Sequence, residues 1–163
     1  MSKYLTNLSF LLAIFTSGIY CQQWTLNVTG EIPTEQIFTH IDFAKFPRST
    51  VSGNNHDGNL HQFQGVALFR LLEASKVLMG DSLRGRHLLL YLQAEAHDGY
   101  KVLYTLAEID TSFTDRLILV ADRKDGKPLD NHEGPLQIIV PGEKKHARWI
   151  RQLRTLRVIR GKI

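Results

Sequence analysis

The sequence predicts one mixed α/β domain that is rich in β-structure. Over most of the chain, apolar residues either alternate with polar residues or form short continuous runs, and both patterns are typical of strands. Asp-Gly and Pro-Gly pairs separate these runs and favour tight turns. Only residues 66–77 carry apolar side chains at helical spacing over several turns, so this segment is the one clear helix, with Leu72 on its inward face.

The first half of the chain is expected to contain a strand, a short helix and a hairpin before that helix. Residues 24–30 alternate apolar and polar side chains, which predicts the first strand. Residues 37–46 favour a short helix that ends before Pro47, because the residue before a proline is disfavoured in helical geometry. The hairpin is expected to have two short strands and a turn between them, at 50–52, 60–63 and 54–58 respectively.

The second half is expected to be mostly strands. His97, Asp98 and Gly99 lie between the apolar runs 88–94 and 100–105, and this arrangement predicts a hairpin because glycine accepts the positive φ that the turn requires. The remaining elements are expected to be a strand, a turn, a strand, a helical turn and a last strand, at 117–121, 124–128, 136–140, 148–153 and 156–159.

The first 21 residues have the pattern of an export signal. Lys3 gives a positive start, residues 8–15 form an apolar run too short to span a bilayer, and small residues follow at 16–18. We expect cleavage after Gly18 or after Cys21, a periplasmic or secreted location, and no stable membrane insertion after processing. No Arg-Arg pair precedes the run, which is typical of Sec-type export of an unfolded chain. A buried N-terminal helix is the alternative.

Cys21 is the only cysteine in the sequence, and the net charge is +4. No internal disulfide can form, although an exported protein occupies a compartment where disulfides are stable. The domain that follows the leader therefore has no thiol to offer a metal, and its stability must come from packing.

Several short segments, taken in order, are similar to those of a known family. They are 28–31, Gly65 and Val66 with the leucines at 68, 71 and 72, and then 95–100, 106–110, 119–128, 133–142 and 147–149. Together they resemble the oxidoreductase molybdopterin-binding domain, which has the sulfite-oxidase-like fold, and especially its small exported bacterial members with a single domain. The resemblance covers about 24–160. It implies a mixed α/β domain with a cofactor cleft lined by loops.

The sequence departs from this family at the metal ligand. The resemblance implies that enzymatic members hold molybdenum through a cysteine in the loop corresponding to 52–59, and here that loop contains no sulfur. An imidazole or carboxylate cannot replace a soft thiolate without changing ligand type and geometry. A cofactor of this size is normally inserted before a folded protein is exported, whereas this leader suits an unfolded chain. We therefore expect no bound cofactor, and molybdopterin is the alternative that the resemblance implies.

Three cations after Pro141 are the first candidate site residues. The resemblance implies that this loop approaches the cofactor phosphate, and Lys144, Lys145 and Arg148 are the positions that could make the contact. Arginine suits it especially, because its planar fork can bind a phosphate through two hydrogen bonds. A solvated basic surface is the other interpretation.

Two turns supply the remaining candidates. His56 and Asp57, and likewise His97 and Asp98, place an imidazole beside a carboxylate, and histidine is easily tuned to titrate near neutral pH. Solvated turns chosen for backbone geometry are the simpler interpretation. The histidines lack the close spacing of a designated zinc site, so no metal site is expected.

Two functions remain open from the sequence. The first is a non-catalytic binding or accessory domain that keeps the family's cleft and binds an anionic small molecule or a partner protein. The alternative is a periplasmic molybdopterin-dependent oxidoreductase or redox partner. The basic C-terminal stretch could bind nucleic acid, but an exported protein seldom meets it, so no nucleic-acid partner is expected.

Overall fold

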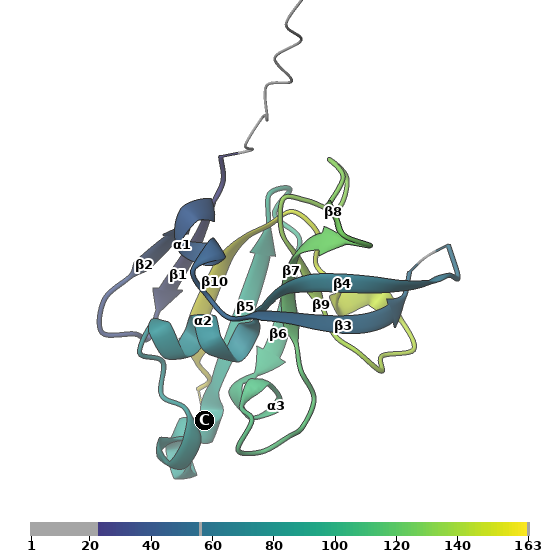
Figure 1. Ribbon diagram of the computed structural model, residues 1–163. Helices are drawn as coiled ribbons and strands as arrows, with labels where there is room; N and C mark the ends of the chain where they lie inside the picture. The colour runs from purple at the N-terminus through teal and green to yellow at the C-terminus, as the bar shows by residue number, and fades with distance from the viewer. Residues whose placement is uncertain (1–22, 56, 163) are drawn as a thin grey trace, which may run out of the picture.

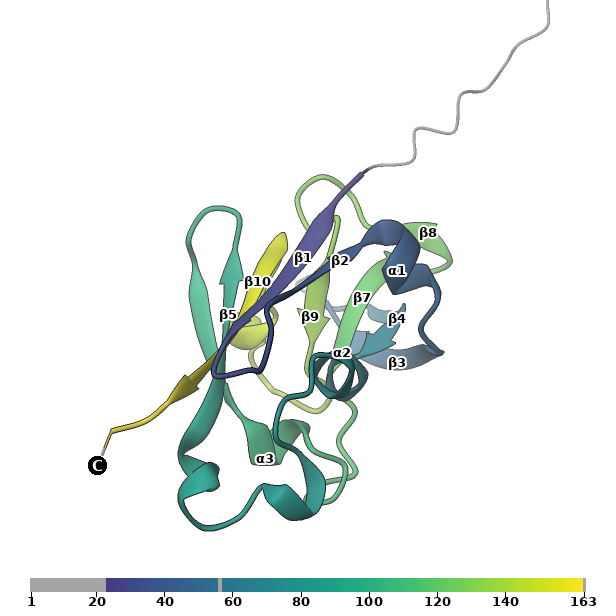
Figure 2. The same cartoon turned by 90° about the vertical axis from the view of Figure 1, so that its left-hand side faces the viewer.

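The computed structural model describes residues 23–55 and 57–162, in which two five-stranded sheets pack around one core (Figure 1). The strands of the first sheet, from edge to edge, are β2 (Gln36–Thr39), β1 (Thr25–Gly30), β10 (Leu153–Arg160), β5 (Leu90–Ala96) and β6 (Lys101–Thr105). Strands β1 and β10 are parallel, and the other neighbours in this sheet are antiparallel. This pairing places the first and last strands of the domain side by side (Figure 2).

The second sheet is antiparallel and runs across the first (Figure 1). Its strands are β3 (Arg48–Asn54), β4 (Leu60–Ala67), β7 (Leu119–Lys124) and β8 (Lys127–Pro128), and β9 (Gln137–Ile139) pairs with β7. Gly65 is required where β4 meets β7, because a Cβ there would lie 2.0 Å from the Val120 carbonyl oxygen. The second sheet therefore depends on one close backbone approach.

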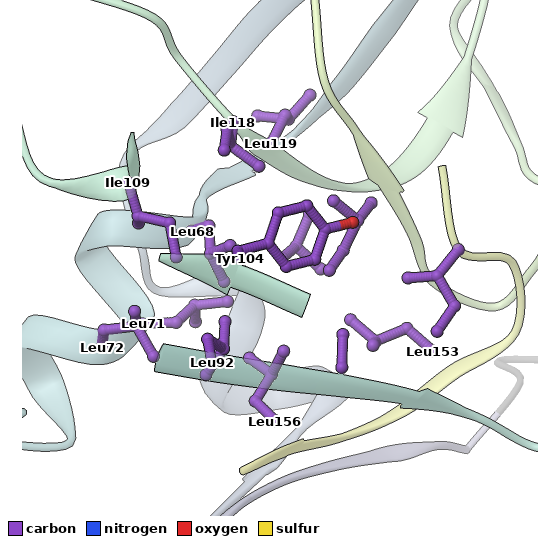
Figure 3. Close-up of a cluster of buried hydrophobic side chains, with 14 of the residues drawn as sticks. Leu68, Leu71, Leu72, Leu92, Tyr104, Ile109, Ile118, Leu119, Leu153 and Leu156 are labelled. Carbon is purple, nitrogen blue, oxygen red and sulfur yellow. The ribbon is translucent and has the colours of Figure 1, made fainter. Parts of the chain in front are cut away.

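Helix α2 (Leu68–Ala74) closes one end of the core. Its Leu68, Leu71 and Leu72 are fully buried, as the helical spacing predicted. Figure 3 shows these leucines beside the buried Tyr104, which lies between Leu119 of β7 and Leu92 of β5. The other helical segments are short: α1 (His40–Ala44), α3 (Leu106–Ile109) and the 3-10 turns η1 (Gly80–Ser82), η2 (Gly85–Leu89) and η3 (His146–Arg148).

Two predicted helices are shorter than expected. The helix predicted at 66–77 begins only at Leu68, because Val66 and Ala67 remain paired with β7, and it ends before Lys76, whose φ is +57°. The helix predicted at 37–46 covers only α1. The residues before it form strand β2, and the Thr39 side chain accepts a hydrogen bond from the Asp42 amide to start the helix.

The hairpins are confirmed, with shifted boundaries. Gly99 has φ +86° in the β5–β6 turn, and the predicted strand at 88–94 begins at Leu90 because η2 precedes it. The loop expected at 52–59 is shorter than predicted, since the residues up to Asn54 belong to β3 and pair with β4. The helical turn predicted at 148–153 lies earlier, as η3, because Leu153 already begins β10.

We predict that Leu72→Ala lowers the free energy of unfolding by about 2–5 kcal/mol, because the side chain is fully buried and its removal leaves a cavity. Denaturant unfolding at neutral pH measures the change. Glu73→Ala, on the exposed side of the same helix, is the control and should cost less than about 1 kcal/mol. Equal effects of the two substitutions would contradict the assigned core.

Candidate functional site

Arg148 fixes the loop that joins β9 to β10. Its guanidinium donates hydrogen bonds to Glu143 from the same loop, with Nε 2.8 Å from Oε1, and to Glu108 of α3 at 3.1 Å. The same group lies 5.0 Å from the centre of the Tyr104 ring, and the Tyr104 hydroxyl donates to the Arg148 carbonyl oxygen. These contacts tie the loop to both α3 and β6.

The electrostatics of this cluster favour a fixed cation. The hydrogen bonds that Arg148 donates to Glu108 and then to Glu143 raise its pKa, against the opposing effect of burial. Burial raises the pKa of Tyr104, so its hydroxyl stays protonated and can donate. Glu108 is itself held by a capping box with Thr105 at the start of α3. The geometry thus uses Arg148 to position the loop, and two protein carboxylates take the place of an external anion.

Lys144 and Lys145 lie in the same loop but differ from Arg148 in their surroundings. Both are exposed, and within residues 23–55 and 57–162 neither makes an ion pair or a side-chain hydrogen bond. They line a cavity of about 690 Å³ together with Asp98, Tyr100, His132 and Arg151. Two lysines and an arginine face one carboxylate there, so the cavity is suited to an anion.

The walls of this cavity are fixed by contacts between loops. The Tyr100 hydroxyl donates to the Ala147 carbonyl oxygen at 2.9 Å, and the Arg151 guanidinium contacts the His132 ring. The imidazole of His146 lies 4.4 Å from the ring of Trp149, centre to centre. The hairpin β5–β6 and the segment 144–152 therefore form one surface.

His97 lies in an adjoining cavity of about 410 Å³. Its walls include Trp24, Pro135, Leu153 and Arg154, so it combines apolar surface with one cation. His97 also donates its backbone N–H to the Gln152 carbonyl oxygen at 3.0 Å. The residue is thus near the cationic cavity but does not line it.

Asp57 lies in the β3–β4 turn and lines neither cavity, and His56 lies outside the described residues. The Asn59 backbone N–H, followed by His61, lowers the pKa of Asp57 to about 2. His61 contacts Asp57 through Nε2 at 2.9 Å and Asp125 of the β7–β8 turn through Nδ1 at 2.6 Å. Hydrogen bonds to Asp125 and then Asp57 raise the pKa of His61. His61 thus links the β3–β4 turn to the β7–β8 turn.

The five candidate residues within the described part of the chain therefore do not line one cavity. Lys144 and Lys145 share the first cavity, while His97 lies in the second. The Arg148 side chain instead binds Glu108 and Glu143. Arg151 also lines the first cavity but was not a predicted site residue, because the spacing of the C-terminal cations does not indicate which of them meet a loop from elsewhere in the chain.

The residues around the end of β3 do not fit a molybdenum centre held by a thiolate. Gly53 lies against Trp149, and a Cβ at this glycine would be 2.5 Å from the indole ring. Trp149 is only 5% exposed, packs edge-on against Phe63 at 5.6 Å, and donates its ring N–H to the Val140 carbonyl oxygen. Among the described residues no three histidine, cysteine or acidic side chains are arranged to hold a metal ion.

Comparisons with known proteins agree with the fold. A family model of the oxidoreductase molybdopterin binding domain matches residues 15–162. Among solved structures, the chain is similar to the sulfane dehydrogenase SoxCD from Paracoccus pantotrophus, with a TM-score of 0.64 and 20% sequence identity. The match covers 83% of this chain and 38% of that chain, so it spans less than half of that relative. A search of curated proteins finds no match.

The family and the fold that the sequence resemblance predicted are thereby confirmed. No helix within the described part of the chain is long and apolar enough to cross a bilayer. The predicted leader lies outside the described residues.

We predict that the contacts of His61 with Asp57 and Asp125 make the stability of the protein depend on pH. The raised pKa of His61 means that its contribution is complete below pH 6.5 and is lost as pH rises through the raised value. The lowered pKa values of Asp57 and Asp125 mean that their contribution is present above pH 3.8 and is lost as pH falls through the lowered values.

The destabilisation caused by His61→Gln should therefore be largest between pH 3.8 and pH 6.5 and should shrink at higher pH. Thermal unfolding across this range measures it. His87→Gln is the control, since His87 contacts no carboxylate among the described residues. A destabilisation by His61→Gln that does not vary with pH would refute this role of the two contacts.

We predict that Arg148→Met lowers the free energy of unfolding by about 1–3 kcal/mol, because it leaves Glu108 and Glu143 without their shared partner. Arg160→Met removes an exposed pair with Glu31 and should cost less than about 1 kcal/mol. Urea unfolding compares the two variants. The cluster would have no positioning role if both changes cost the same.

Proposed function

We propose that the chain, which belongs to the oxidoreductase molybdopterin-binding domain family, is a non-catalytic member that binds an anionic ligand. The observation that carries this proposal is the pairing of Gly53 with Trp149 at the end of β3. Gly53 belongs to the segment 52–59, in which the family resemblance implies the metal-ligating cysteine, and the only cysteine of the sequence is Cys21. The fold is kept without the residues for the metal chemistry, since function depends on the site and not on the fold.

The first cavity supports anion binding as the retained activity. Lys144 and Lys145 have no carboxylate partner among the described residues, so their charges are available to a ligand. Arg151 adds a third cation, and Asp98 is the one carboxylate that lines the wall. Charge-assisted hydrogen bonds are stronger than neutral ones, particularly where water is partly excluded. The ligand would be held by the two lysines and Arg151 rather than by Arg148.

Export is the second part of the proposal. The leader-like pattern of the first 21 residues supports a periplasmic or secreted location, with cleavage after Gly18 or Cys21.

A molybdopterin-dependent oxidoreductase or redox partner is the alternative function, and the match to the family model over residues 15–162 favours it.

The test measures binding of inorganic pyrophosphate by isothermal titration calorimetry. The double variant Lys144→Ala/Lys145→Ala should weaken binding by roughly tenfold or more, because it removes two charge-assisted contacts from the cavity. Lys127→Ala/Lys162→Ala lowers the net charge equally but changes residues outside the cavity, so it should bind like the wild type. Equal binding by both double variants would overturn the assignment.

A further inference from the structure

The two cavities described above meet at Gln152, which lines both of them. Asp98 lines the first cavity and its neighbour His97 the second, so the turn of the β5–β6 hairpin also borders both. The two cavities therefore share part of their lining.

Gln152, which lines both cavities, is fixed by its hydrogen bonds. Gln152 has φ +48°, a left-handed conformation that costs free energy for a residue other than glycine. Its backbone N–H donates to the Glu133 carbonyl oxygen at 2.9 Å, and its carbonyl oxygen accepts from the His97 N–H at 3.0 Å. Its side-chain amide donates to the Asn131 carbonyl oxygen at 2.8 Å. Three hydrogen bonds thus hold Gln152 between two loops, at the boundary of the two cavities.

The chemistry of the two cavities differs. The first carries three cations, Lys144, Lys145 and Arg151. The second carries Arg154 at an apolar wall formed by Trp24, Pro135 and Leu153. A matching ligand has several negative charges at one end and an apolar group at the other.

An acidic peptide has this distribution, and a nucleic acid does not. A nucleic acid carries a phosphate at every step of its backbone, so a strand that follows the groove would bring phosphates against the apolar wall. A peptide can place carboxylates in the first cavity and an apolar side chain in the second. The side chains that line the groove therefore favour the peptide.

We propose that the two cavities form one groove for an extended acidic peptide segment that carries an apolar residue. Its carboxylates bind Lys144, Lys145 and Arg151, and its apolar side chain enters the second cavity beside Arg154. This inference rests on the proposed function, because it makes the anion of the first cavity one end of the peptide.

The test uses fluorescence polarisation with two labelled probes. One is triglutamate, and the other is a hexapeptide of three glutamates, two glycines and a C-terminal leucine. The hexapeptide should bind at least about tenfold more tightly, since only this probe also buries a leucine side chain. Arg154→Glu should remove most of this advantage, because it places a carboxylate beside the C-terminal carboxylate of the bound leucine. It should leave triglutamate binding within about twofold, because Arg154 lines only the second cavity.

Arg157→Glu is the matched control. It makes the same change of charge at an exposed position of the same strand, outside both cavities, and it should leave the hexapeptide advantage intact. Circular dichroism checks that both variants fold.

The outcomes separate this inference from the proposed function. If triglutamate and pyrophosphate bind but the hexapeptide binds no more tightly, the groove is refuted and the anion site stands. If neither anion binds, both proposals fail. Binding of hexathymidylate as tightly as the hexapeptide would show that charge alone is recognised and would also refute the groove.

Discussion

The ionic cluster around Arg148 is the interaction on which the loops of the site depend. One guanidinium holds Glu108 of α3 and Glu143 of its own loop, and the Tyr104 hydroxyl returns a hydrogen bond to the Arg148 backbone. Trp149 and Arg151, which both line the first cavity, follow Arg148 closely in the chain. With the loop fixed in this way, Lys144 and Lys145 line the first cavity while the Trp149 side chain is buried. One cation is used to build the loop, and its neighbours remain available.

The same packing separates the fold of the family from its metal chemistry. Trp149 closes the end of β3 because Gly53 leaves room for the indole, and Phe63 supports the ring from β4. A side chain at position 53 would displace the tryptophan, so the glycine and the tryptophan form a matched pair. The chain has both sheets and a core that includes the leucines of α2, and the segment 52–59, in which the family resemblance implies a thiolate, contains no cysteine.

Local patterns in the sequence predicted the strands and hairpins well, because alternation and Asp-Gly turns act over a few residues. They overestimated α2, since pairing of Val66 and Ala67 with β7 depends on residues far away in the chain. Long-range partners explain the site as well. Arg148 meets Glu108 across 40 positions and His61 meets Asp125 across 64, and no local pattern encodes either contact. The left-handed Gln152 likewise has no signal in the sequence.

We propose that this family member has an anion-binding cavity and no molybdenum centre. The most direct measurement is the molybdenum content of the protein, expressed with its own leader in a host that makes molybdopterin and purified from the periplasm. Inductively coupled plasma mass spectrometry gives the metal per chain, and intact-mass analysis gives the processed N-terminus. We expect far less than one molybdenum per chain in a protein that has lost its leader. One molybdenum per chain would contradict the proposal.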